Sequence, residues 1–152
     1  MKRRIVSILA AFALLIACGK DKFQTKPSIT LKSISSKIIP VSGNMTLELD
    51  YRDKEGDLAN EPLLFIKVRN NENVQATVRD TLELELPDFP KRSQGVIQLN
   101  LDYQNYLISA SSPPTDPDGV AESDSLTMKF VLRDNAGNIS DTLVINDIVI
   151  KR

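Results

Sequence analysis

The side chains in this chain that could do chemistry are few, and most of them are carboxylates. The 152-residue sequence has no histidine and one cysteine, Cys18. A Ser-His-Asp or Cys-His catalytic site therefore cannot be built, because the usual general base is missing. A zinc site is also disfavoured, because its preferred ligands are histidine and cysteine. What remains is Cys18 itself and a set of acidic residues in two turns, namely Asp53, Glu55, Asp57 and Asp134.

The two acidic turns predict a calcium site if the fold brings them together. The first three residues follow the second predicted strand, and Asp134 begins the turn before the last one. Successive loops of an antiparallel sandwich alternate between its two ends, so these two turns share an end. Hard carboxylate oxygens are the ligands that Ca²⁺ prefers, although the spacing is not that of an EF-hand. The alternative is that these residues only cap turns beside Gly56 and Gly137.

The elements that must position these residues are strands. Apolar and polar residues alternate through the mature chain, as in Leu47-Glu48-Leu49-Asp50-Tyr51, and this period of two is typical of half-buried antiparallel strands. Turn-forming residues separate the alternating runs. The predicted strands are residues 28–35, 44–51, 63–70, 77–86, 95–103, 124–133 and 139–150.

Seven short strands in about 125 residues favour an all-β fold, an antiparallel seven-stranded immunoglobulin-like β-sandwich over residues 27–152. The Cys…Trp…Cys signature of antibody domains is absent, so fibronectin-, cadherin- and PKD-like sandwiches remain open. The segment YRDKEGDL (51–58) resembles one found in Bacteroidota lipoproteins with Ig-like or PKD-like domains. Residues 131–140, VLRDNAGNIS, resemble the Asp-x-Ala-Gly-Asn-x-Ser hairpin of bacterial Ig-like domains.

The N-terminus is typical of an export signal. Residues 1–4 are basic after the initial methionine, and residues 5–17 form a run in which Ser7 is the sole polar residue. Such a run is too short to span a bilayer, which needs about 20 residues, and matches a secretory signal of about 7–15 apolar residues. The run ends in Leu15-Ile16-Ala17-Cys18, which resembles the lipobox of bacterial lipoproteins. The alternative is an ordinary signal peptide with a chance cysteine.

The lipobox resemblance implies that residues 1–17 are a signal peptide cleaved between Ala17 and Cys18, and that Cys18 carries a diacylglyceryl group. Residues 18–26 would then tether the domain to the bilayer. Lys20-Asp21 resembles the Lys-acidic signal that sends Bacteroidota lipoproteins to the cell surface, which favours the outer membrane's outer face over its periplasmic face. The alternative is a plain solvated tether.

The balance of basic and acidic residues helps to choose among the remaining classes of function. The full chain has a formal net charge of −1, and after residue 17 it has 16 basic and 20 acidic residues, a net charge of −4. This argues against a nucleic-acid partner, which usually needs a basic face. The sequence favours a non-enzymatic envelope module that binds a protein or glycan. The alternatives are a carboxylate-based glycan hydrolase and an adhesion module stabilised by calcium.

One long linker could make the contact with such a partner. Residues 104–123 exceed the usual loop length of about 12–15 residues, and loops of that length are often functional. We expect this linker at the end of the domain that faces away from the membrane, with Tyr103, Tyr106 and Leu107 beginning a contact surface. The alternative is a mobile loop without a function.

Overall fold

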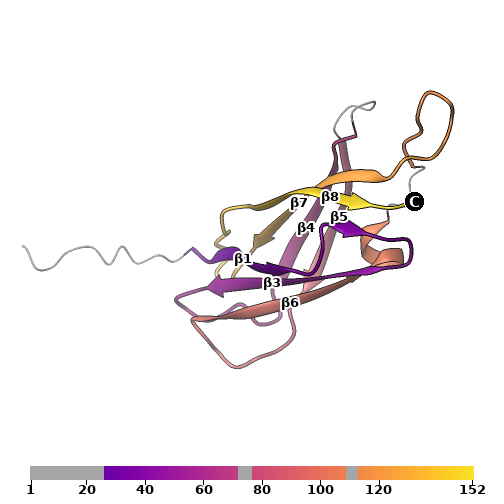
Figure 1. Ribbon diagram of the computed structural model, residues 1–152. Coiled ribbons are helices and arrows are strands. Elements are labelled where there is room, and N and C mark those ends of the chain that lie inside the picture. The colour runs from indigo at the N-terminus through magenta and orange to yellow at the C-terminus, as the bar shows by residue number, and fades with distance from the viewer. Residues whose placement is uncertain (1–25, 72–76, 109–112) are drawn as a thin grey trace, which may run out of the picture.

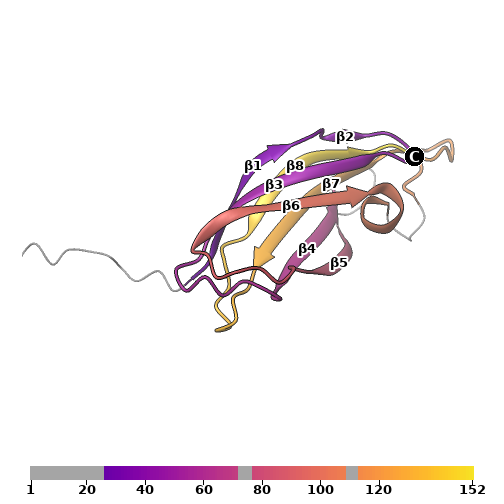
Figure 2. The same cartoon turned by 90° about the horizontal axis from the view of Figure 1, so that it is seen from below.

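The computed structural model describes residues 26–71, 77–108 and 113–152, which form eight strands and one helical turn (Figures 1 and 2). Strand bounds were expected from alternation, and most agree with that expectation within a few residues. The elements are β1 (Ser28–Ile34), β2 (Ile38–Ile39), β3 (Asn44–Arg52), β4 (Pro62–Arg69), β5 (Thr77–Glu85), β6 (Gln94–Asp102), the helical turn η1 (Tyr103–Leu107), β7 (Asp124–Leu132) and β8 (Leu143–Ile150).

The strands form two sheets that face each other. One sheet has the order β1-β3-β6 and the other β2-β8-β7-β4-β5. All pairs are antiparallel except β2 with β8, which is parallel. The predicted all-β class is confirmed, but the described residues contain an eighth strand. Strand β2 escapes sequence reasoning because two residues are too few to show an alternation, and Pro40 ends the strand directly after Ile39.

The core lies between the two sheets and explains the alternation in the sequence. Each strand turns every second side chain toward the opposite sheet. Strands β3 and β7 show this most regularly. Their buried apolar residues are Met45, Leu47, Leu49 and Tyr51 in β3 and Leu126, Met128, Phe130 and Leu132 in β7. Phe65 of β4 stacks on Phe130 with ring centroids 4.9 Å apart, which fixes the centre of the five-stranded sheet.

The two long sides of the sandwich differ. On one side the chain changes sheets between β1 and β2, and Ser35 still donates to the Thr46 carbonyl of the first sheet. Two residues later the Lys37 carbonyl accepts from Val149 of the second sheet, so this side is closed. The other side ends in β6 of one sheet and β5 of the other. No strand in the described part of the chain joins these two edges.

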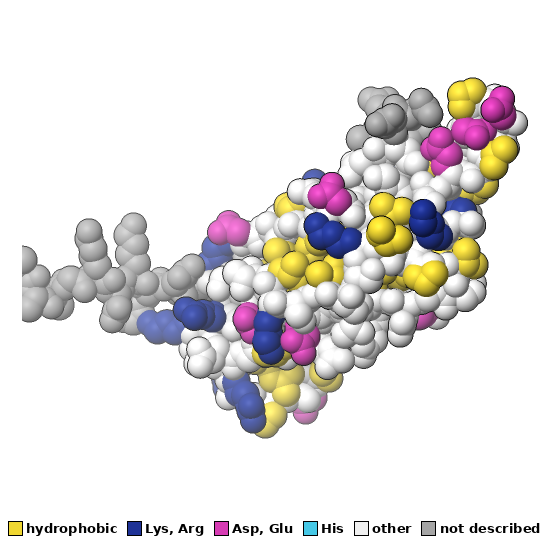
Figure 3. Space-filling view, viewed as in Figure 1, with side chains coloured by type: hydrophobic (Ala, Val, Ile, Leu, Met, Phe, Trp, Pro, Cys, Tyr) yellow, Lys and Arg dark blue, Asp and Glu magenta, His cyan; other side chains and the backbone are white. Residues whose placement is uncertain are grey.

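The loops gather at two ends, as the sequence predicts. Strand β1 begins beside the end of β3, since Ser28 pairs with Arg52, so the described chain begins at the end that holds the loop after β3. The segment before β7 lies at the opposite end (Figure 1). Figure 3 shows Lys and Arg side chains near the end where β1 begins and acidic side chains on this opposite segment. We call these the proximal and distal ends.

The start of the predicted long linker is a helical turn. In η1 the Ile108 amide donates to the Tyr103 carbonyl over 2.8 Å, and the Asp102 carboxylate caps the turn by accepting from the Asn105 amide. Tyr103 and Leu107 are buried in the core, so the predicted contact surface is wrong for these two residues. A helical turn places residues four apart on the same side, and here that side faces inward. Tyr106 is half-buried.

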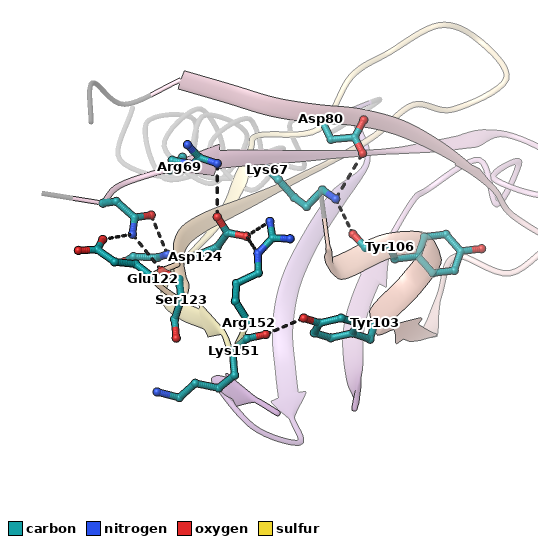
Figure 4. Close-up of polar contacts among 12 residues, drawn as sticks. Lys67, Arg69, Asp80, Tyr103, Tyr106, Glu122, Ser123, Asp124, Lys151 and Arg152 are labelled. Atoms are coloured by element: carbon teal, nitrogen blue, oxygen red, sulfur yellow. Dashed lines mark hydrogen bonds and ion pairs between the residues drawn. The ribbon is translucent and has the colours of Figure 1, made fainter. Parts of the chain in front are cut away.

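Buried charged side chains form ion pairs and hydrogen bonds at the distal end (Figure 4). Asp124 at the start of β7 is 1% exposed and accepts from Nε and Nη2 of Arg152 at 2.9 and 2.5 Å. Arg69 of β4 lies 3.5 Å from the other carboxylate oxygen. Nearby, the Lys67 ammonium donates to the Tyr106 carbonyl over 2.6 Å. Burial lowers the pKa of Lys67, and the opposed carboxylate of Asp80, 3.3 Å away, partly offsets that effect.

Removal of the central carboxylate should destabilise this end strongly. We expect Asp124→Ala to lower the free energy of unfolding by about 3–5 kcal/mol, because it removes the counter-charge from the largely buried guanidinium group of Arg152. Urea unfolding followed by circular dichroism measures this. Asp118→Ala, which removes an exposed acid from the same end, serves as the control. A loss below about 1 kcal/mol in the Asp124 variant would show that the cluster is not held by charge.

Candidate metal centre

The structure brings together three of the four predicted ligands at the proximal end. Carboxylate oxygens of Asp53, Asp57 and Asp134 all lie within 4.8 Å of one another. Asp53 and Asp134 are buried, and Asp57 is half-buried. Glu55 is exposed and is not part of this group. The prediction that the two turns meet is therefore confirmed, and the prediction that Glu55 joins them is corrected.

A tightly turned loop after β3 supplies the first two carboxylates. The Asp53 amide donates to the Ser93 carbonyl, which holds the start of the loop against the segment before β6. The Asp57 amide then donates to Oδ2 of Asp53 over 2.9 Å, so the loop closes on its own first carboxylate. Gly56 permits the turn with a φ of +66°, and a Cβ there would lie 2.9 Å from the Arg92 backbone nitrogen. The side chains of Asp53 and Asp57 thus face one point, and that of Glu55 between them does not.

The turn after β7 supplies the third carboxylate. The Asp134 side chain accepts from the backbone amide of Asn138 at 2.7 Å and from its side-chain amide at 2.8 Å. The Asp134 carbonyl also accepts from Gly137, whose φ of +86° lets the chain reverse. This is the turn-capping role that the sequence analysis gave as the alternative. The carboxylate performs that role and faces the cluster as well.

Some carboxylate oxygens of the cluster are buried without a hydrogen-bond donor. Oδ1 of Asp53 and Oδ1 of Asp57 are buried and accept no hydrogen bond. Asp53 as a whole is 2% exposed. Burial raises the pKa of Asp57, and the neighbouring charges of Asp53 and Asp134 raise it further. A buried oxygen without a donor costs about 1–3 kcal/mol, and more when it is charged, so this group needs either a proton or a cation.

The donor set suits a hard divalent cation. Three carboxylates offer only oxygen atoms, as Ca²⁺ requires, and backbone carbonyls or water would complete its six to eight ligands. The hydrogen bonds that Asp53 and Asp134 accept come from neutral amides, which do not cancel the charge. The residues therefore fit calcium, with Asp53 and Asp57 from one loop and Asp134 from the other.

The remaining predicted site residues have other positions. Ala17 and Cys18 lie outside the described residues, so the predicted cleavage and lipid attachment stay predictions. None of the helices in the described part of the chain is long and apolar enough to cross a membrane. The buried Lys67 and the charges around Asp124 were not found from the sequence. Lys67 occupies an inward position of β4, and a lysine at such a position is the signal that could have found them.

Comparisons with known proteins assign no family to this chain. No protein-family model and no curated protein matches it. Among solved structures it is similar to Spo0M, a sporulation control protein of Bacillus subtilis, with a TM-score of 0.47 and 7% identity over 84% of this chain and 50% of that one. It is also similar to a β-glucosidase of Listeria innocua in complex with gluconolactone, with a TM-score of 0.40 and 7% identity over 84% of this chain and 16% of that one. The chain spans at most half the length of these proteins, and likenesses this distant assign it no activity.

The raised pKa of Asp57 gives a pH-dependent stability with a definite sign. Because the folded protein binds this proton more tightly than the unfolded chain, the wild type loses stability as the pH rises from the ordinary Asp value of 3.8 through the raised value. The Asn side chain of the Asp57→Asn variant does not titrate, so its stability does not fall for this reason. Without divalent cations, the stability of the variant relative to the wild type should therefore increase over that pH interval. Urea unfolding in chelator between about pH 3.5 and 7 measures the difference. Parallel stability curves for the two proteins would contradict the expectation.

Proposed function

We propose that this protein is a lipid-anchored, non-enzymatic module of a bacterial cell envelope, built as an immunoglobulin-like β-sandwich whose membrane-proximal end binds calcium. The observation that carries the calcium part is the cluster of Asp53, Asp57 and Asp134, with one buried Asp53 oxygen that accepts no hydrogen bond. The lipid anchor rests on the lipobox-like residues 15–18. On this proposal Cys18 attaches to the outer membrane, with the cell surface favoured.

The position of the cluster supports a role in orienting the domain. Strand β1 starts beside Arg52, one residue before the first ligand, so the tether and the acidic loops would share the proximal end. Calcium there would join the loop after β3 to the turn after β7, two segments that no strand pairing connects directly. The calcium sites of extracellular modules have Kd values of about 10⁻⁴–10⁻³ M. A stiff proximal end would hold the distal end away from the membrane.

A role in glycan hydrolysis fits the geometry of these three carboxylates less well than calcium binding does. Paired catalytic carboxylates in glycosidases lie about 5–10 Å apart, with room for a sugar or water between them. The oxygens of this cluster lie within 4.8 Å of one another, and two of the three residues are buried. A single cation can contact all three carboxylates at that separation.

Calcium should stabilise the folded protein through this cluster. At about 1 mM Ca²⁺ and a Kd of about 10⁻⁴ M, ligand linkage gives about 1.4 kcal/mol, which raises Tm by a few degrees. Thermal unfolding in calcium and in chelator measures the shift. We expect Asp53→Asn to abolish the shift, because it removes a ligand charge.

Glu55→Gln is the matched control for this experiment. It removes one exposed acid from the same loop, outside the cluster, and should keep the full calcium shift. An equal Tm for the wild type in calcium and in chelator would overturn the metal site. An equal loss of response in both variants would mean that the effect is general screening of charge.

Lipid attachment should depend on one atom, the sulfur of Cys18. In a bacterial host that processes lipoproteins, we expect the wild-type chain in the membrane fraction with a mass that fits a diacylglyceryl group on residue 18. Cys18→Ser should release the protein into the soluble fraction or leave the signal peptide uncleaved. Two or more acyl chains hold a protein durably, since each buried methylene contributes about 0.8 kcal/mol. A soluble wild-type protein cleaved elsewhere would contradict the anchor.

A further inference from the structure

A pocket of about 330 Å³ opens on the side of the sandwich where β6 has no neighbouring strand among the described residues. It lies between β6 and the segment after β5, and most of its lining residues are apolar, among them Phe89 and Ile97. Its polar side chains are those of Tyr51, Arg92 and Gln98. Apolar walls with a few polar groups are typical of small-molecule sites of about 300–1,000 Å³. The volume of this pocket fits a small ligand.

The wall formed by the segment between β5 and β6 is held in place by the protein itself. At one end of this segment the Leu86 amide donates to the Glu61 carbonyl over 3.1 Å. At the other end the Ser93 carbonyl accepts from the Asp53 amide over 2.9 Å. Two prolines between these ends fix the backbone φ angle at their positions. The pocket is therefore formed before a ligand binds, which lowers the entropic cost of binding.

The hydroxyl of Tyr51 is a polar group of this pocket without a partner among the described residues. Tyr51 is 5% exposed, and its hydroxyl lies beside Gly95, another lining residue, where a Cβ would be 2.8 Å from it. It forms no hydrogen bond with a residue that the structure describes. A buried tyrosine hydroxyl usually has such a partner, as Tyr103 does when it donates to the Lys151 carbonyl over 2.7 Å. The Tyr51 hydroxyl is thus available to a ligand.

Arg92 sets the charge of the ligand. It is the one charged residue among the described residues that line the pocket, and it is exposed. It forms no ion pair with another described residue. A guanidinium group has five donors and no acceptor, and its planar fork matches the two oxygens of a carboxylate. A single positive charge beside apolar walls therefore favours a monoanion with an apolar body.

We propose that this pocket binds a small amphipathic carboxylate, whose acidic group pairs with Arg92 and whose apolar part fills the space beside Phe89. The Tyr51 hydroxyl donates a hydrogen bond to an oxygen of this ligand. The apolar part is a single ring or a short acyl chain, because the pocket has no room for a larger body. The site uses neither the acidic cluster nor the lipid anchor, so it goes beyond the proposed function and stands without it.

Titration followed by NMR tests the proposal on the chain from residue 19 to residue 152, which contains every residue that the structure describes. The probes are three carboxylates, namely octanoate, phenylbutyrate and indoleacetate, with phenylbutanol as the uncharged match of phenylbutyrate. We expect at least one carboxylate to bind with a Kd of about 1 mM or below and to shift the backbone amides of Leu86, Phe89 and Ile97. Phenylbutanol should bind about tenfold more weakly than phenylbutyrate, because it cannot pair with the guanidinium group.

Three variants assign the contacts. Arg92→Gln should weaken carboxylate binding about tenfold and leave phenylbutanol binding unchanged. Lys91→Gln is the matched control, because it removes the same charge from a neighbouring exposed residue outside the lining, and it should bind as the wild type does. Tyr51→Phe should weaken carboxylate binding about threefold. It should leave the urea midpoint unchanged, because the hydroxyl that it removes has no partner in the described chain.

Four results would overturn the proposal. They are no shift of these amides by any carboxylate, shifts confined to residues outside the pocket, equal affinities for phenylbutanol and phenylbutyrate, and equal weakening by Arg92→Gln and Lys91→Gln. A short peptide that ends in phenylalanine is the last probe. If it binds more tightly than all three carboxylates, and its amidated form does not bind, the pocket belongs to the C-terminus of a partner protein and the proposal is wrong.

Discussion

Burial of one apolar face from every strand between two sheets is the interaction on which the rest of this structure depends. It fixes the register of each strand, because a shift by one residue would turn the apolar set outward. The unbroken pairing of β3 with β6 and the stacked rings of Phe65 and Phe130 show how closely that register is kept. Once the strands are set, the antiparallel connections decide which loops meet. The cluster of Asp53, Asp57 and Asp134 is a consequence of that topology.

Much of this could be predicted from the sequence because the signals were periodic. Alternation gave the main strands, and the alternation of loops between two ends placed Asp53 beside Asp134 without any contact information. Shorter or less regular elements left no such signal. Strand β2 has two residues, and η1 buries Tyr103 and Leu107 through a single helical turn. The choice of Asp57 over Glu55 depends on the turn at Gly56, whose packing against Arg92 comes from a distant segment.

The open edge of β6 follows from the same constraint. A sandwich needs only one face of each strand buried, so nothing in the core requires that the last strand of a sheet be covered. On the opposite side the chain crosses from β1 in one sheet to β2 in the other. The backbone amides of Val149 and Lys151 donate hydrogen bonds to this crossing segment. Between β5 and β6 the chain makes a loop at the proximal end instead. The apolar residues of β6 thus lie beside an edge that the described chain leaves unpaired.

The two ends of the sandwich bury acidic groups in opposite ways, and the contrast bears on the metal centre. At the distal end, Asp124 is buried with Arg152 and Arg69 against its oxygens, so the chain itself supplies the counter-charge. At the proximal end, three carboxylates converge, and the hydrogen bonds that Asp53 and Asp134 accept come from neutral amides. A divalent cation drawn from the surroundings would supply the positive charge that neutral amides do not, and this is the role that we propose for calcium.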